Sequence, residues 1–102
     1  MAQHVTFWRM KVQPGKLNDF KALMNARQEE ARLKATGWVQ TIVGECKDVS
    51  DEIWGVVTWD TSDRYYKNAE SPEQNQWFEK MRSFLAADPE WFDCDVVEDN
   101  RA

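Results

Sequence analysis

Four stretches of the chain are rich in β-branched and aromatic residues and are bounded by turn-forming residues. They are residues 4–12, 38–46, 53–59 and 91–98. Runs of this kind predict β-strands, and the Pro, Gly, Asp and Ser residues around them predict turns. Residues 53–59 are nearly all apolar, which indicates a strand that is buried on both faces. The sequence therefore predicts a sheet of four strands.

The segments between these strands carry helical patterns. A first helix is expected from about residue 16, because apolar side chains recur there at helical spacing. These are Leu17, Phe20, Leu23, Met24 and Ala31. The residues "DTSD" (60–63) offer caps for a short second helix that carries Tyr65 and Tyr66. A third helix is expected after Ser71, which suits the N-cap, with Pro72 in the first helical position.

The order strand, helix, two strands, two helices, strand is typical of the ferredoxin-like βαββαβ fold, an α+β architecture. It predicts an antiparallel sheet in the order 4-1-3-2 with the helices on one face. The length of 102 residues is that of one domain. We therefore expect a single domain over residues 1–102, with a core over about 4–98 and a short tail at 99–102.

The face of the sheet without helices is also expected to be apolar. In the first strand Val5 and Phe7 share one parity, and Trp8 and Met10 share the other. An apolar sheet face is too large a patch to leave in water. We therefore expect a homodimer that packs sheet face against sheet face.

Charge and composition exclude several classes of partner. The net charge is −5, which disfavours nucleic acid, since binding to phosphates depends on Lys and Arg. No apolar run approaches the roughly 20 residues that cross a bilayer, and the N-terminus lacks the pattern of a signal peptide. We therefore expect a cytoplasmic protein without a membrane partner. Cys46 and Cys94 fit no metal-binding spacing, and no metal site is predicted.

Three segments resemble one family. They are "VQPGKLNDFKAL" after the first strand, "VVTWDTSD" at the end of the third, and "SPEQNQWFEKM" in the last helix. With these segments the chain resembles, over about residues 4–98, the antibiotic-biosynthesis monooxygenase-like family of dimeric α/β barrels. The resemblance implies a homodimer and a ligand cleft between the sheet and the helices of each subunit.

The resemblance also implies candidate chemistry. Part of the family oxygenates phenolic or quinol substrates without a cofactor, using Asn, Trp, Tyr and Arg side chains. Such a site must position an aromatic molecule and stabilise a developing oxyanion with hydrogen-bond donors. The matching candidates are Tyr65, Tyr66, Asn68 and Arg82 as catalytic donors, with Trp8, Trp77 and Met81 as ligand-binding residues. Because Tyr65 and Tyr66 are adjacent on a helix, they are not expected to point the same way. The expected substrate is a small aromatic, quinol or polyketide-like molecule.

Two alternatives remain open. The protein could be a non-catalytic, ligand-binding or stress-associated barrel whose aromatic side chains only fill the core. The haem-degrading branch is disfavoured, because the positions of its Asn, Trp and iron-binding His hold Trp8, Asn68 and Phe78 here. The chain's one histidine, His4, stands at the start of the first strand and no axial ligand is in place.

Two further expectations concern charged and titratable residues. His4 is expected to be an exposed residue at a strand end. Arg9 and Lys11 share one parity of the first strand, and Asp93 and Asp95 share one parity of the last. Because these strands are antiparallel neighbours in the predicted fold, we expect a ladder of ion pairs between them.

Overall fold

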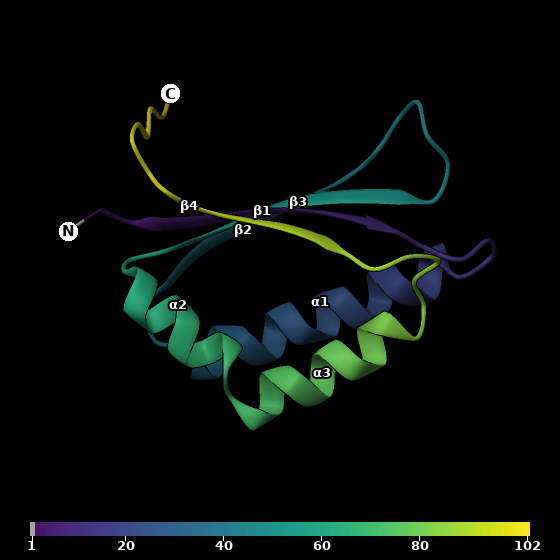
Figure 1. Ribbon diagram of the computed structural model, residues 1–102, viewed down its shortest axis with the longest axis horizontal. Helices are drawn as coiled ribbons and strands as arrows, with labels where there is room; N and C mark the ends of the chain where they lie inside the picture. Colours follow the sequence, from purple (N-terminus) through teal and green to yellow (C-terminus); the bar gives the residue numbers. More distant parts are fainter. Residues whose placement is uncertain (1) are drawn as a thin grey trace.

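The computed structural model describes residues 2–102, apart from the side chain of Leu33. Its elements are β1 (His4–Lys11), α1 (Leu17–Lys34), β2 (Trp38–Glu45), β3 (Glu52–Trp59), α2 (Ser62–Ala69), α3 (Pro72–Arg82) and β4 (Glu90–Asp95). The strands form an antiparallel sheet in the order β2-β3-β1-β4. The helices lie together on one side of this sheet (Figure 1). The predicted α+β ferredoxin-like fold and its strand order are confirmed.

The helices α2 and α3 begin where their capping residues predict. The Thr61 hydroxyl accepts a hydrogen bond from the Arg64 backbone N–H at 3.2 Å. The Ser71 hydroxyl accepts one from the Gln74 backbone N–H at 3.2 Å, and Pro72 opens α3. Such caps satisfy backbone donors that a helix leaves free at its first turn. None of the helices in residues 2–102 has the length and apolar character needed to cross a membrane.

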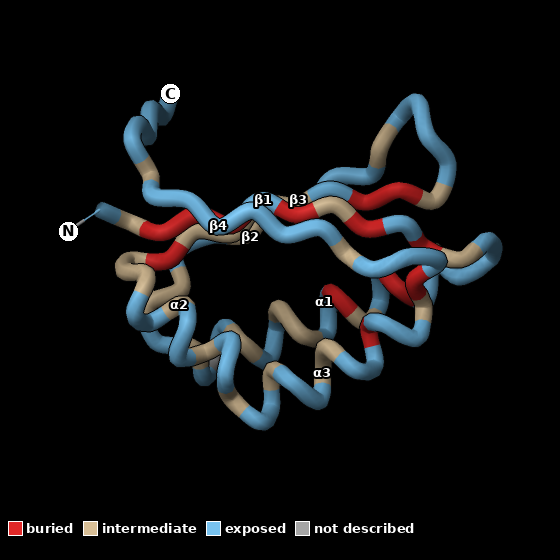
Figure 2. The backbone as a smooth tube through the Cα atoms, in the orientation of Figure 1, coloured by how far each residue is buried: buried red, intermediate tan, exposed pale blue. Residues whose placement is uncertain are grey.

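The hydrophobic core lies between the sheet and the helices. Phe20 from α1 and Met81 from α3 are fully buried, and they pack with Met10 of β1 and Ile53 of β3. Figure 2 shows the buried positions running along the two central strands and on the facing sides of the helices. Burial of each large side chain contributes about 1.5–3 kcal/mol, so this layer holds the helices on the sheet.

The opposite face of the sheet carries no helix (Figure 1). Four large apolar side chains are exposed there: Phe7 at 48%, Ile42 at 55%, Trp54 at 51% and Phe92 at 54%. The strand register brings them together. Phe7 on β1 lies opposite Phe92 on β4, and β1 pairs on its other side with β3, the strand that carries Trp54. The sheet is therefore apolar on both faces, as the sequence predicts. We call this surface the open face.

The predicted ladder between Arg9 and Lys11 on β1 and Asp93 and Asp95 on β4 is wrong. In the register, Arg9 lies opposite Glu90, and its Nη2 forms an ion pair with Glu90 at 2.8 Å. Both aspartates lie opposite buried residues of the helix-covered face, whereas both basic residues belong to the open face. Alternate residues of one strand share a face, but this alternation does not determine which set of residues on a neighbouring strand lies on the same face.

Candidate functional site

A cavity of about 460 Å³ lies between the sheet and the helices. Its volume is in the range of small-molecule sites, about 300–1,000 Å³. Aromatic rings from both layers form much of its wall. They belong to Trp8, Trp38, Trp59, Tyr65, Trp77, Phe78 and Trp91. A planar organic molecule would find ring faces and edges on several sides.

The cavity also has polar walls. Arg27, Gln28, Thr41, Asn68, Gln74, Asn75 and Asp93 line it. The Arg27 guanidinium, from α1, donates to the Gln74 side-chain oxygen of α3 at 2.7 Å. Among the lining residues that the structure describes, Arg27 and Asp93 carry the charges. The cavity therefore offers both donors and acceptors to a ligand.

The Trp8 ring lies directly over Gly55 on the neighbouring strand. A Cβ atom at Gly55 would lie 2.0 Å from Cζ2 and 2.2 Å from Cε2 of Trp8. Real Cβ atoms do not approach other atoms so closely, so a residue with a side chain would displace the ring. Glycine at position 55 thus allows the indole to lie against the sheet and form part of the cavity wall.

Four of the residues singled out in the sequence come together at this cavity. They are Tyr65 and Asn68 on α2, Trp8 on β1 and Trp77 on α3. The buried Trp77 Nε1 has no hydrogen-bond partner among the described protein atoms. A buried donor of this kind costs about 1–3 kcal/mol when it stays unpaired. The indole N–H is closed off from the cavity in this structure, so Trp77 contributes its ring to the wall rather than a donor.

Three other singled-out residues do not line the cavity. Tyr66 is 43% exposed, and its hydroxyl donates to Asp93 Oδ2 at 3.4 Å. Arg82, at the end of α3, forms an ion pair with Asp88 at 2.7 Å. Met81 is fully buried in the hydrophobic core. As expected, Tyr65 and Tyr66 point differently, and only Tyr65 reaches the cavity wall.

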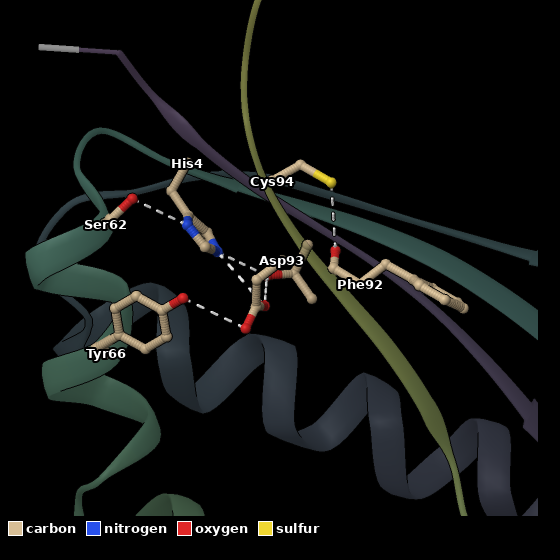
Figure 3. Close-up of polar contacts among 7 residues, drawn as sticks. His4, Ser62, Tyr66, Phe92, Asp93 and Cys94 are labelled. Carbon is tan, nitrogen blue, oxygen red and sulfur yellow. Dashed lines mark hydrogen bonds and ion pairs between the residues drawn. The ribbon is translucent and has the colours of Figure 1, made fainter.

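The expectation that His4 is exposed is wrong. The side chain is 2% exposed because β1 is a central strand and α2 covers this end of it. The imidazole Nδ1 lies 3.1 Å from Ser62 Oγ, and Nε2 lies 2.7 Å from Thr6 Oγ1. The ring also stacks on Tyr65, with a centroid distance of 4.1 Å. Figure 3 shows His4 held between Ser62 of α2 and the Asp93 side of β4.

Burial sets the protonation of this cluster. It lowers the pKa of His4, although the nearby Asp93 and Asp95 carboxylates act in the opposite direction. Desolvation also raises the pKa of the Tyr65 hydroxyl, so this group stays a neutral donor at neutral pH. Both His4 nitrogens are engaged in hydrogen bonds. Iron could bind a His4 nitrogen only if one of these hydrogen bonds were broken.

Asp93 is a lining residue that the sequence did not reveal, and His4 lies behind it, joined to it through Thr6. Asp93 lines the cavity and accepts a hydrogen bond from the Thr6 hydroxyl at 2.7 Å. The available sequence signal is that Asp93 stands two residues after Trp91, on the same face of β4. If Trp91 faces the helices, Asp93 must face them too, and its side chain then lies at the site.

No family model matches the sequence, and no curated protein matches it. Solved structures do match over nearly the whole chain. A variant of SnoaB, a cofactor-independent oxygenase from Streptomyces nogalater, has a TM-score of 0.83 at 14% identity and covers 97% of each chain. A candidate antibiotic biosynthesis monooxygenase from Caulobacter crescentus CB15 has a TM-score of 0.87 at 15% identity, covering 95% of this chain and 92% of the other.

A conserved protein from Methanosarcina mazei Go1 is also similar, with a TM-score of 0.82 at 18% identity over 92% of each chain. At these identities the likeness concerns the fold. The resemblance noted in the sequence is thereby confirmed at that level: the chain has the fold of the antibiotic biosynthesis monooxygenases.

Proposed function

We propose that the protein is a cofactor-independent monooxygenase that acts on a small aromatic, quinol or polyketide-like molecule bound between the sheet and the helices. The cavity of about 460 Å³ with aromatic walls is the observation that carries the proposal. The SnoaB structure, described as a cofactor-independent oxygenase, supports it through the shared fold. A protein whose aromatic residues only filled its core would not leave such a space beside Trp8.

The lining residues suggest roles. The rings of Trp8 and Trp77 contact the substrate from the sheet side and from the helix side. These contacts fix the plane of the substrate ring. The Tyr65 hydroxyl and the Asn68 amide supply donors for an oxygen atom that gains negative charge. Tyr66 and Arg82 were candidates for the same role, but they lie outside the lining, so we assign them no direct contact with substrate.

The chemistry needs no bound redox group if the substrate supplies all the electrons. A methylene group beside a phenol or ketone can lose its protons as it gives electrons to oxygen. One oxygen atom forms a carbonyl at that carbon, and the other leaves as water. The conversion of CH₂ and O₂ to C=O and H₂O is balanced, with four electrons passing from the carbon to oxygen. The protein then contributes binding, orientation and donors to the developing oxyanion.

Oxygen consumption tests this proposal. Purified protein treated with a chelator is mixed with a panel of phenols, quinols and anthrone-like ketones in an oxygen electrode. We expect uptake with at least one compound, and a lower rate for the Tyr65→Phe/Tyr66→Phe double variant. Uptake that never exceeds that of the double variant across the panel would remove the case for an oxygenase.

A binding protein without turnover is the second candidate. One observation favours it, since Tyr66 and Arg82 do not reach the cavity and only part of the expected donor set is in place. This candidate predicts that calorimetry detects binding of aromatic compounds while the electrode records no oxygen uptake. Binding accompanied by uptake contradicts it.

We further propose that the protein forms a homodimer through its open face. The four large apolar side chains on that face are about half exposed in the single subunit. A contiguous apolar surface of this kind marks an interaction site in soluble proteins. Light scattering should give twice the subunit mass of 12.0 kDa. A stable monomer at micromolar concentration would contradict this assembly.

A further inference from the structure

A chain of hydrogen bonds runs from α2 to the cavity through buried side chains. It starts at Ser62, passes through His4 and Thr6, and ends at Asp93, which lines the cavity. Thr6 is fully buried and His4 is 2% exposed. Figure 3 shows His4 between its α2 partner and the Asp93 carboxylate on β4. Buried polar groups are costly to arrange, so a connected set beside a cavity indicates a specific use.

The direction of these hydrogen bonds follows from the chemistry of each group. Thr6 has one hydroxyl proton and donates it to Asp93 Oδ1 at 2.7 Å. Its oxygen must then accept from His4 Nε2, which lies 2.7 Å away. The neutral imidazole therefore carries its proton on Nε2, and its Nδ1 accepts from the Ser62 hydroxyl at 3.1 Å. Every donor in the chain points toward Asp93.

The Asp93 carboxylate accepts the last hydrogen bond of this chain. Within residues 2–102, no Lys or Arg forms an ion pair with Asp93, and the His4 Nε2 at 3.7 Å belongs to a neutral ring. Its side chain is 37% exposed, so part of the carboxylate is open. The second oxygen, Oδ2, accepts a hydrogen bond of 3.4 Å from the Tyr66 hydroxyl, and the Tyr65 hydroxyl also faces the carboxylate. A carboxylate offers about four acceptor positions, and Asp93 thus has acceptor capacity left for a ligand.

We propose that Asp93 recognises a hydroxyl or enol group of an uncharged aromatic ligand and accepts its proton during turnover, while Thr6 and His4 position the carboxylate. The inference rests on the proposed function, because it needs an aromatic ligand in the cavity. It names the substrate class more narrowly: a molecule that presents a hydrogen-bond donor at the Asp93 side. Ligands that carry a negative charge at that point are rejected by repulsion.

The proton transfer is balanced. The ligand O–H bond breaks, its electron pair stays on the ligand oxygen, and the proton joins an Asp93 oxygen. A carboxylate is a weaker base than a phenolate by about six pKa units in water. The transfer therefore takes place as the ring loses electron density to oxygen, rather than in the resting complex. Until then Asp93 acts as a charged hydrogen-bond acceptor that orients the ligand.

A pair of probes tests the inference. 1-Naphthol has the donor hydroxyl, and 1-methoxynaphthalene lacks it. Calorimetry with the native protein should give naphthol an affinity about tenfold higher or more, because a hydrogen bond to a charged group is stronger than a neutral one. Asp93→Asn should reduce this preference to within about threefold. Asp95→Asn makes the same change in charge two residues along β4, outside the cavity lining, and should leave the preference unchanged.

The positioning role of Thr6 has its own comparison. Thr6→Val removes the hydroxyl at nearly constant volume and should weaken the preference for naphthol several-fold. Thr6→Ser keeps the hydroxyl and should restore it, which a purely structural role of the methyl group would not explain. If Asp93→Asn does not fold, equal affinity of the native protein for the two probes still overturns the inference, and the two Thr6 variants still test the positioning role.

The outcomes separate the two proposals. Equal affinity of the native protein for the two probes, or an unchanged preference in Asp93→Asn, overturns the inference and leaves the aromatic cavity intact. An unchanged preference in Thr6→Val overturns the positioning role. Failure of both probes to bind the native protein overturns the proposed function, and the inference with it.

Discussion

Replacement of Gly55 by alanine tests how the cavity is built. The added Cβ would lie 2.0 Å from Trp8 Cζ2, whereas ordinary contact begins at 3.4 Å. The indole must therefore move by roughly 1.4 Å, the difference between these two distances. Trp8 is 5% exposed and is packed in the core cluster, so the ring can move only against its neighbours or into the cavity.

Two measurable effects follow. Overpacking lowers the free energy of unfolding by about 1–3 kcal/mol. Alanine in place of glycine raises it by about 0.5–1 kcal/mol, because alanine loses less backbone entropy on folding. The net loss is at most about 2.5 kcal/mol, which corresponds to a fall in Tm of up to about 20 °C for a domain of this size. The affinity for 1-naphthol should also fall, because the displaced ring narrows the cavity. Thermal unfolding followed by circular dichroism and calorimetric titration provide the two readouts.

Gly44→Ala is the matched control, since a Cβ at Gly44 meets no atom within 4 Å. It makes the same chemical change in a neighbouring strand without a clash inside the subunit. If Gly55→Ala matches Gly44→Ala in both Tm and affinity, Trp8 is not held against Gly55. The description of the cavity wall would then be wrong.

Three further predictions concern assembly, pH and helix capping. Phe92→Lys should convert the dimer to a monomer in light scattering with little loss of subunit stability, because Phe92 is 54% exposed. Val97→Lys is the control: this position is 97% exposed outside the strands, and the variant should stay dimeric. A dimeric Phe92→Lys variant would refute the open-face assembly. The lowered pKa of His4 predicts that the unfolded chain binds a proton first as the pH falls below 6.5, so the free energy of unfolding should decrease there. Denaturant titrations between about pH 8 and about pH 5, a range around the ordinary His pKa, should show this decrease in the native protein and a smaller one in His4→Gln. If the free energy of unfolding changes with pH equally in both proteins, His4 is not held neutral. Ser71→Ala should lower the free energy of unfolding by about 1 kcal/mol through loss of the α3 cap. Ser50→Ala, in the exposed β2–β3 turn, is the control. An equal effect of both substitutions would argue against the cap as the cause.

The fold could be predicted because its signals are local. The Ser71–Pro72 pair marks the start of α3 by hydrogen-bonding and backbone geometry that need no distant partner. The apolar spacing of Phe20 and Met24 places one side of α1 against the sheet, and both are buried. The apolar character of both parities of β1 predicts an open face, which the exposed Phe7 confirms.

The site could be predicted only in part, because it depends on how distant strands align. Trp8 and Tyr65 were implied by the family resemblance, and both line the cavity. Asp93 was assigned to an ion-pair ladder instead, since the sequence does not specify which parity of β4 faces the helices. His4 was expected to be exposed because its burial comes from α2, which lies far along the chain. Arg82 was misleading because the end of α3 directs it to Asp88.

Isotope labelling tests the central claim most directly. Chelator-treated protein is incubated under ¹⁸O₂ with a substrate that supports oxygen uptake, and the product is analysed by mass spectrometry. A cofactor-independent monooxygenase should place one labelled oxygen atom in each product molecule, at a rate that depends on the intact cavity and falls in Gly55→Ala. Product that carries no label, or that forms equally fast without the protein, would contradict the proposed function.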